Sequence, residues 1–145
     1  MTALTRRRCD NEHEETWHVY FGDVRVGSIG MRAGVPTSTD QWGWSVGFYP
    51  GIEPGTQRSG SAATFDEARV AFERAWQELQ PTLTEDNYEA WRLSRDFHAW
   101  KYRMWDEGCQ MPTQNQSGWS KCFCGESIPV ACDAHIRSVH RGIGA

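Results

Sequence analysis

The sequence contains no apolar run long enough to span a bilayer, which takes roughly 18–20 residues. The three consecutive arginines at positions 6–8 are not followed by an apolar stretch either, so they do not form a secretory signal. Both absences favour a cytoplasmic protein that has no contact with membranes. In a reducing compartment, five cysteines with three of them clustered are more typical of metal ligands than of a disulfide framework.

Positive charge and nucleotide motifs are also scarce. The formal net charge is −4 at pH 7, which argues against a general attraction to nucleic acid or to anionic lipid. Gly22, Gly27 and Gly30 do not fit a dinucleotide fingerprint, and no Gly-Lys-Ser/Thr loop is present for phosphates. The basic residues 6–8 are followed at once by acidic ones, so we expect a solvated, flexible tail over residues 1–15.

Aromatic residues, by contrast, are abundant, with eight tryptophans, six phenylalanines and four tyrosines in 145 residues. Their side chains dominate the burial energy of a small core, so we expect a compact folded domain. Two alternating segments, residues 16–21 and 24–29, are joined by a Gly-Asp turn and predict a β-hairpin. Residues 41–49 predict a third strand, because large apolar side chains alternate there with small ones.

Two helices should follow these strands, after a Gly- and Pro-rich loop over residues 50–62. Thr64 and Glu67 have the spacing of a capping box, and apolar residues then recur at three- and four-residue steps as far as Pro81. A second helix should begin after Thr84 and end near Glu107. Its aromatic residues lie on several faces, so this helix needs partners on more than one side.

These elements predict an α+β fold, in which a three-stranded antiparallel sheet packs on one helix and is followed by a second long aromatic helix and a small C-terminal zinc finger. The sheet and both helices are expected over residues 16–109. A linker is expected over residues 110–118, which contain Pro and many polar residues, and the zinc-finger segment over residues 119–145.

The last quarter of the chain concentrates the residues that bind soft metals. Cys122, Cys124, Cys132, His135 and His140 fall within nineteen residues. Thiolate and imidazole donors at such short separations suit a tetrahedral Zn²⁺ site. Because at least four donors are available, we expect one structural zinc ion in a closed site and no enzymatic activity.

The segment 122–140 resembles a shortened C2H2 zinc finger, which has two close cysteines on a hairpin and two histidines on a following helix. The resemblance implies Cys122, Cys124, His135 and His140 as the metal ligands. Pro129 suits the first turn of the helix that carries the histidines. The spacing is tighter than in the usual finger, with one residue between the cysteines and ten between Cys124 and His135.

Cys132 leaves an alternative ligand set open. It lies three residues before His135, where the family places a buried apolar residue, and a free cysteine can take that role. We therefore read Cys132 first as a core residue. The alternative is a Cys3His set of Cys122, Cys124, Cys132 and His135, which would leave His140 on the surface.

The predicted finger lacks the side chains that read DNA bases. Ile128, Ala131 and Ala134 fall near the base-reading positions of the family, and none of them can hydrogen-bond a base edge. We therefore favour a protein partner, whose identity the sequence does not give. The alternative is a nucleic-acid-associated protein, and a more remote one is a zinc hydrolase, which would need an open coordination position.

In the nucleic-acid alternative, the contacts would come from the arginines at positions 6–8 and from the second helix. There the basic residues Arg92, Arg95, Lys101 and Arg103 interleave with aromatic ones, a mixture typical of single-strand binders. The sheet should contribute little, because its face opposite the core is expected to carry only His18, Tyr20 and Arg25 among several glycines.

Overall fold

The computed structural model describes residues 3–10 and 13–145 of the chain. The chain divides into two compact units, Met1–Trp91 (unit 1) and Arg92–Ala145 (unit 2), and each has its own buried core. The division falls inside helix α2 (Glu85–Asp106), which the sequence analysis placed whole in the segment 16–109. Within the described residues, no helix combines the length and the apolar character that crossing a bilayer requires.

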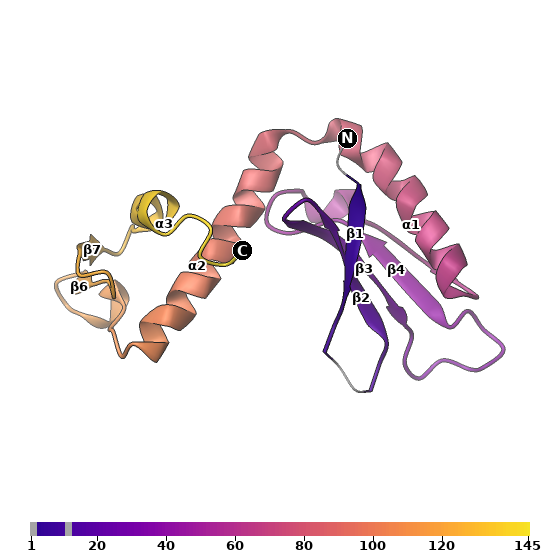
Figure 1. The fold of residues 1–145 in the computed structure, drawn as a ribbon, viewed down its shortest axis with the longest axis horizontal. Helices are drawn as coiled ribbons and strands as arrows, with labels where there is room; N and C mark the ends of the chain where they lie inside the picture. The colour runs from indigo at the N-terminus through magenta and orange to yellow at the C-terminus, as the bar shows by residue number, and fades with distance from the viewer. Residues whose placement is uncertain (1–2, 11–12) are drawn as a thin grey trace. The chain divides into compact units, whose positions relative to one another are not determined.

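Unit 1 is built on a five-stranded antiparallel sheet whose strands follow one another in sequence order (Figure 1). The strands are β1 (Leu4–Arg8), β2 (Thr16–Phe21), β3 (Val24–Met31), β4 (Trp42–Val46) and β5 (Arg58–Ala62). The prediction of a three-stranded sheet is therefore wrong. Strand β1 lies in the segment for which the sequence predicts a flexible tail, and β5 lies in the predicted loop.

Strand β1 forms although it has no apolar alternation. Its register with β2 runs from the pair Leu4–Phe21 to the pair Arg8–Trp17. The guanidinium of Arg6 lies 5.0 Å from the ring centre of Trp17, a cation–π contact on the core side of the strand. Aromatic neighbours on β2 thus give a basic strand a surface on which to pack.

One face of this sheet is covered by helix α1 (Phe65–Leu79), as Figure 1 shows. The N–H of Glu67 donates to the Thr64 hydroxyl over 3.2 Å, which confirms the predicted helix start. Phe72 of α1 is fully buried above Gly27, where a β-carbon would come within 2.7 Å of the Phe72 ring. The helix can approach the sheet this closely because position 27 is glycine.

Short helices and a hairpin complete the two units. Unit 1 also contains the 3-10 helices η1 (Pro54–Thr56) and η2 (Gln80–Thr82). Unit 2 contains the second part of α2, η3 (Pro112–Gln114), β6 (Trp119–Lys121), β7 (Ser127–Pro129) and α3 (Asp133–Val139). Pro129 pairs with Trp119 in the β6–β7 hairpin, so it ends a strand and does not begin the helix that carries His135.

The core of unit 2 joins α2 to the hairpin and to α3. Its buried members are Trp100, Met104, Cys122, Ile128, Cys132 and Ile136. Asp96 on α2 secures the end of the chain by accepting hydrogen bonds from the backbone N–H groups of Gly142 (2.9 Å) and Gly144 (3.1 Å). Burial alone would raise the pKa of Asp96, but these hydrogen bonds and the neighbouring Arg95 hold it below its usual value.

Candidate metal centre

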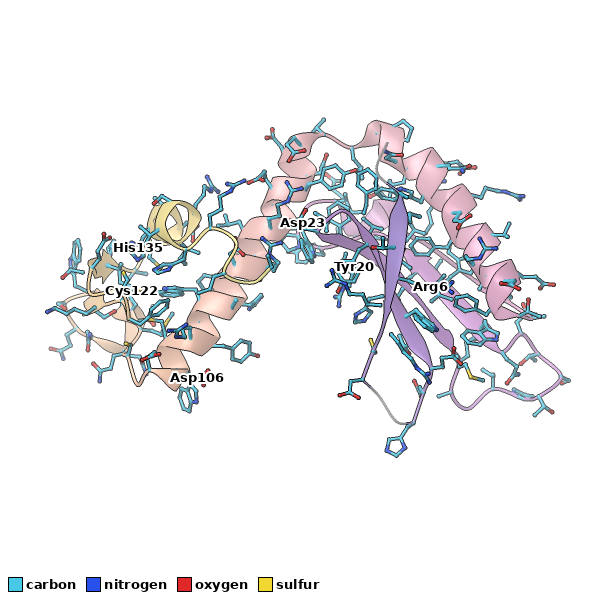
Figure 2. All side chains as sticks on the ribbon, in the orientation of Figure 1. Arg6, Tyr20, Asp23, Asp106, Cys122 and His135 are labelled. Carbon is cyan, nitrogen blue, oxygen red and sulfur yellow. The ribbon has the colours of Figure 1, made fainter. Side chains whose placement is uncertain are left out.

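Four side chains with metal-donor atoms converge on the turn of the β6–β7 hairpin. Cys122 follows β6 directly, and Cys124 lies in the turn that leads to β7. Gly125 has a φ of +95°, and its N–H donates to the Cys122 carbonyl over 2.9 Å, so the chain folds back tightly here. His135 lies on α3 and His140 directly follows it, which brings both imidazoles to the turn (Figure 2).

Three of the distances between donor atoms are close to those expected between the corners of a tetrahedral zinc site. His140 Nε2 lies 3.3 Å from Cys122 Sγ and 3.2 Å from His135 Nε2, and Cys124 Sγ lies 3.5 Å from His135 Nε2. With Zn–S bonds of about 2.3 Å and Zn–N bonds of about 2.0 Å, a regular tetrahedron has corners about 3.3–3.8 Å apart. All four donors lie within 4.8 Å of one another, so this Cys2His2 group can hold a metal ion.

Two further side chains contact the donors from outside. The indole N–H of Trp100 donates to Cys122 Sγ over 3.2 Å, and Glu126 Oε2 lies 2.9 Å from His135 Nδ1. A hydrogen bond at Nδ1 fixes the ring so that Nε2 faces the other donors, which is the usual outer contact of a metal-bound histidine. No pattern in the sequence marks Trp100, because this residue comes from a different helix and reaches Cys122 only in the folded unit.

The donors disfavour charge on one another when no cation is present. Cys124 is exposed, but loss of part of its solvation and the neighbouring Cys122 raise the pKa of its thiol. Burial and the nearby His135 lower the pKa of His140, which favours the neutral imidazole that binds metals. A divalent cation would offset the repulsion between two thiolates, so the electrostatics of the group fit a bound metal.

Cys132 lies apart from this donor group. Its side chain is buried in the core of unit 2 with Ile128 and Ile136, and burial raises the pKa of its thiol. Among the residues that the structure describes, the group of possible metal donors includes His140 but not Cys132. The geometry therefore favours the Cys2His2 set over the Cys3His alternative.

No family model matches the chain, and neither the curated proteins nor the solved structures contain a match to it. The zinc-finger resemblance of residues 122–140 therefore stays a prediction.

The four basic residues proposed for nucleic-acid contacts all lie on α2 and differ in how far they are already engaged. Arg95 pairs with Asp96 over 3.1 Å, and its side chain is largely buried. Arg103 pairs with Glu107 over 2.9 Å and also lies over the Phe123 ring. Lys101 is exposed, and Arg92 is half-buried. Two of the four charges are thus already engaged within unit 2.

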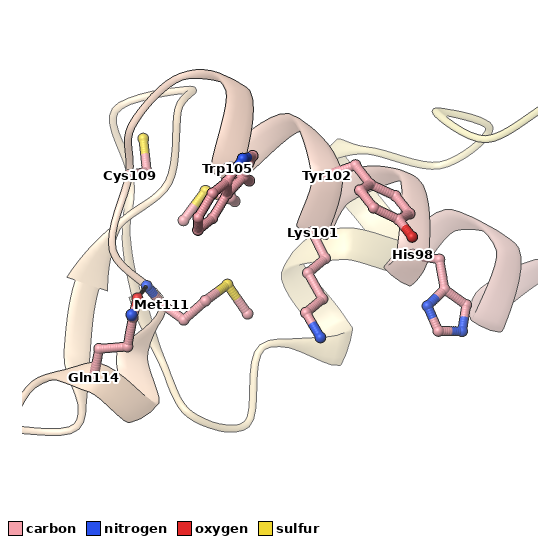
Figure 3. A pocket seen from close by; sticks show the side chains of 8 residues that line it. His98, Lys101, Tyr102, Trp105, Cys109, Met111 and Gln114 are labelled. Atoms are coloured by element: carbon pink, nitrogen blue, oxygen red, sulfur yellow. Dashed lines mark hydrogen bonds between the residues drawn. The ribbon is translucent and has the colours of Figure 1, made fainter.

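A groove that the sequence analysis did not predict opens along α2 in unit 2 (Figure 3). It has a volume of about 430 Å³. Its walls include two aromatic residues, two methionines and two basic residues, namely Tyr102, Trp105, Met104, Met111, His98 and Lys101. Trp105 is 82% exposed and Tyr102 is 72% exposed, so the groove has an aromatic rim open to solvent.

Proposed function

We propose that this protein is a non-enzymatic, zinc-dependent binding module in which one Zn²⁺ ties the β6–β7 hairpin to α3. The donor distances carry the proposal, because three of them, between 3.2 and 3.5 Å, fit the corners of a tetrahedron and all four donors lie within 4.8 Å of one another. Four protein donors leave no coordination position for a reacting water, as in structural zinc sites. The ion would compensate for the small core of unit 2.

Metal content tests this proposal directly. Native mass spectrometry of the reduced full chain, supplied with zinc, should find one ion in the wild type and none after Cys122→Ala or His135→Ala. Cys109→Ala is the matched control, since Cys109 belongs to unit 2 but not to the donor group. A folded wild-type chain without zinc, or a Cys122→Ala chain that retains it, would refute the site.

We further propose that the groove on unit 2 receives a protein partner. Met104 and Met111 offer an adaptable apolar surface, and exposed aromatic residues such as Trp105 are enriched at binding sites. The ionisable lining is basic, with Lys101 and His98, and includes no acidic side chain. These features fit a peptide segment that presents an apolar side chain beside acidic residues.

A displayed peptide library tests the chemistry of this partner without requiring its identity. Panning on the zinc-loaded chain should enrich peptides with an aliphatic or aromatic residue next to Asp or Glu. Trp105→Ala should abolish the enrichment, and Trp119→Ala, which alters an exposed tryptophan outside the groove, should not. Equal enrichment on wild type and Trp105→Ala would contradict docking in the groove.

A further inference from the structure

The five strands of the unit 1 sheet contain basic residues but no acidic ones. None of the five strands contains an aspartate or a glutamate, whereas together they contain five arginines and one histidine. Unit 1 as a whole has fourteen acidic residues against eight arginines. All of the acidic residues therefore lie outside the strands, and Asp66, Glu67, Glu73 and Glu78 lie on α1.

The strand register identifies the side chains on the face opposite α1. One row of paired residues runs across all five strands in the order Arg7, His18, Ser28, Ser45 and Ser59. The hydroxyl oxygens of Ser28 and Ser45 lie 3.3 Å apart, so these two side chains point to the same side. Because adjacent strands lie about 4.8 Å apart, the row is roughly 19 Å wide.

A second row strengthens the basic character of this face. Thr5, Tyr20 and Arg25 are paired in register next to the first row. The guanidinium of Arg7 lies 4.6 Å from the Tyr20 ring centre, and an Arg25 nitrogen lies 3.5 Å from His18 Nδ1. Arg6, in contrast, contacts the Phe65 ring and so lies on the α1 side of the sheet. Figure 2 labels both Arg6 and Tyr20.

The two arginines of this face are available to a partner. Both Arg7 and Arg25 are exposed, and neither forms an ion pair with any residue that the structure describes. By contrast, Arg69 on α1 pairs with Glu73 over 3.0 Å. Basic residues such as Arg69 on the α1 side are thus paired with acidic ones, whereas Arg7 and Arg25 on the opposite face are not paired with any described acidic residue.

We propose that the sheet face formed by Arg7, His18, Tyr20, Arg25 and the serines of the first row binds the phosphate backbone of nucleic acid. Arg, Ser, Thr and Tyr are the side chains that commonly contact phosphate. The face has no large aliphatic side chain of the kind that anchors a protein interface, and its serines let a backbone approach closely. Strand β1 completes the surface and makes it more basic than the sequence predicts.

Fluorescence anisotropy with a labelled mixed-sequence DNA duplex of about twenty base pairs tests the proposal over roughly 50–200 mM salt. The probe is titrated with the zinc-loaded full chain. The double variant Arg7→Gln/Arg25→Gln removes two charges from the sheet face. Its matched control, Arg69→Gln/Arg74→Gln, removes the same charge from α1 on the other side. Circular dichroism verifies that both variants are folded.

The logarithm of the wild-type association constant should fall linearly with the logarithm of the salt concentration. Each phosphate contact should add about 0.9 to the magnitude of this slope. The sheet-face variant should bind at least about tenfold more weakly at low salt and lose about two units of slope, while the α1 control should stay within about twofold of wild type. Ser45→Lys should strengthen binding. Equal losses in both double variants, no wild-type binding at low salt, or equal competition by polyglutamate would each overturn the proposal.

This inference is independent of the zinc site, because the sheet face lies wholly in unit 1. A chain with Cys122→Ala should therefore keep its duplex affinity even where zinc is lost. The failure of one proposal would leave the other standing.

Discussion

The indole nitrogen of Trp100 lies 3.2 Å from the sulfur of Cys122 and donates a hydrogen bond to it. Trp100 is fully buried, so this N–H has no access to water and is satisfied by the sulfur. A thiolate accepts such a bond more strongly than a thiol does, because the negative charge strengthens the interaction. The contact therefore links the α2 helix to the charge state of the donor group.

Replacing Trp100 with Phe should weaken zinc binding while keeping most of the packing. Phe keeps an aromatic ring, smaller than the indole, but the sulfur of Cys122 loses its hydrogen-bond donor. The loss of such an outer contact typically costs about 10–100-fold in metal affinity. Competition with a colorimetric zinc chelator measures the change. Trp105→Phe is the control, since Trp105 is exposed on the same helix. An unchanged zinc affinity in Trp100→Phe would show that the bond does not support the metal.

Replacing Cys132 with Ala should leave zinc bound and reduce stability. Cys132 lies in the unit 2 core and outside the donor group, so the variant creates a small cavity with a cost of roughly 1 kcal/mol. Native mass spectrometry and thermal unfolding of the same sample separate the two effects. Loss of zinc in Cys132→Ala, with zinc kept in His140→Ala, would instead establish the Cys3His ligand set.

The sequence was sufficient for the elements with a strong periodic or capping signal. Thr64 and the apolar stripe after it predict α1, and the helix after Thr84 forms as expected over Glu85–Asp106. The clustering of metal donors was also visible in the sequence, and the resemblance to a C2H2 finger implied the set Cys122, Cys124, His135 and His140. In each of these cases the residues that determine the feature lie close together in the sequence, within one helix or within residues 122–140.

The sequence was insufficient where the deciding contacts come from distant segments. Strand β1 has no apolar alternation, and Arg6 packs on Trp17 and Phe65 only once the sheet and α1 have formed. Strand β5 consists of small and polar residues, and Gly60 lies so close to Trp44 that a β-carbon would meet the indole at 2.7 Å. Tertiary packing determines that both segments form strands, and local β-propensity does not indicate this.

Replacing Asp96 with Asn should loosen the end of the chain. The carboxylate accepts N–H donors from both Gly142 and Gly144, whereas an amide offers one oxygen and turns an NH₂ group toward the other donor. Hydrogen bonds to a charged group contribute about 1.5–3 kcal/mol, so the free energy of unfolding should fall by about that amount. Hydrogen exchange at Gly142 and Gly144 reports the local effect. Asp106→Asn, on an exposed site of α2, should leave both amides protected.

His18 should titrate below the ordinary histidine pKa, because half-burial and the positive charge of Arg25 both lower its pKa. The groups that face it are the Cys9 thiol at 3.1 Å, Arg25, and Arg7 across the strand pair. NMR titration of the imidazole in the zinc-loaded chain should place the midpoint below about 6.5. Arg25→Gln should raise the midpoint, and Arg74→Gln on α1 should not. An Arg25→Gln midpoint equal to that of wild type would remove Arg25 as a cause.

The same shift determines how His18 affects stability as the pH changes. The unfolded chain takes up the proton more readily than the folded one, so neutral His18 favours folding above about pH 6.5. That contribution is lost as the pH falls from there through the lower folded-state pKa. His18→Gln, which keeps every metal donor, should therefore lose less unfolding free energy than wild type between pH 7 and acid conditions. Denaturant titrations of both chains at matched zinc test this, and parallel losses would mean that His18 is not the group responsible.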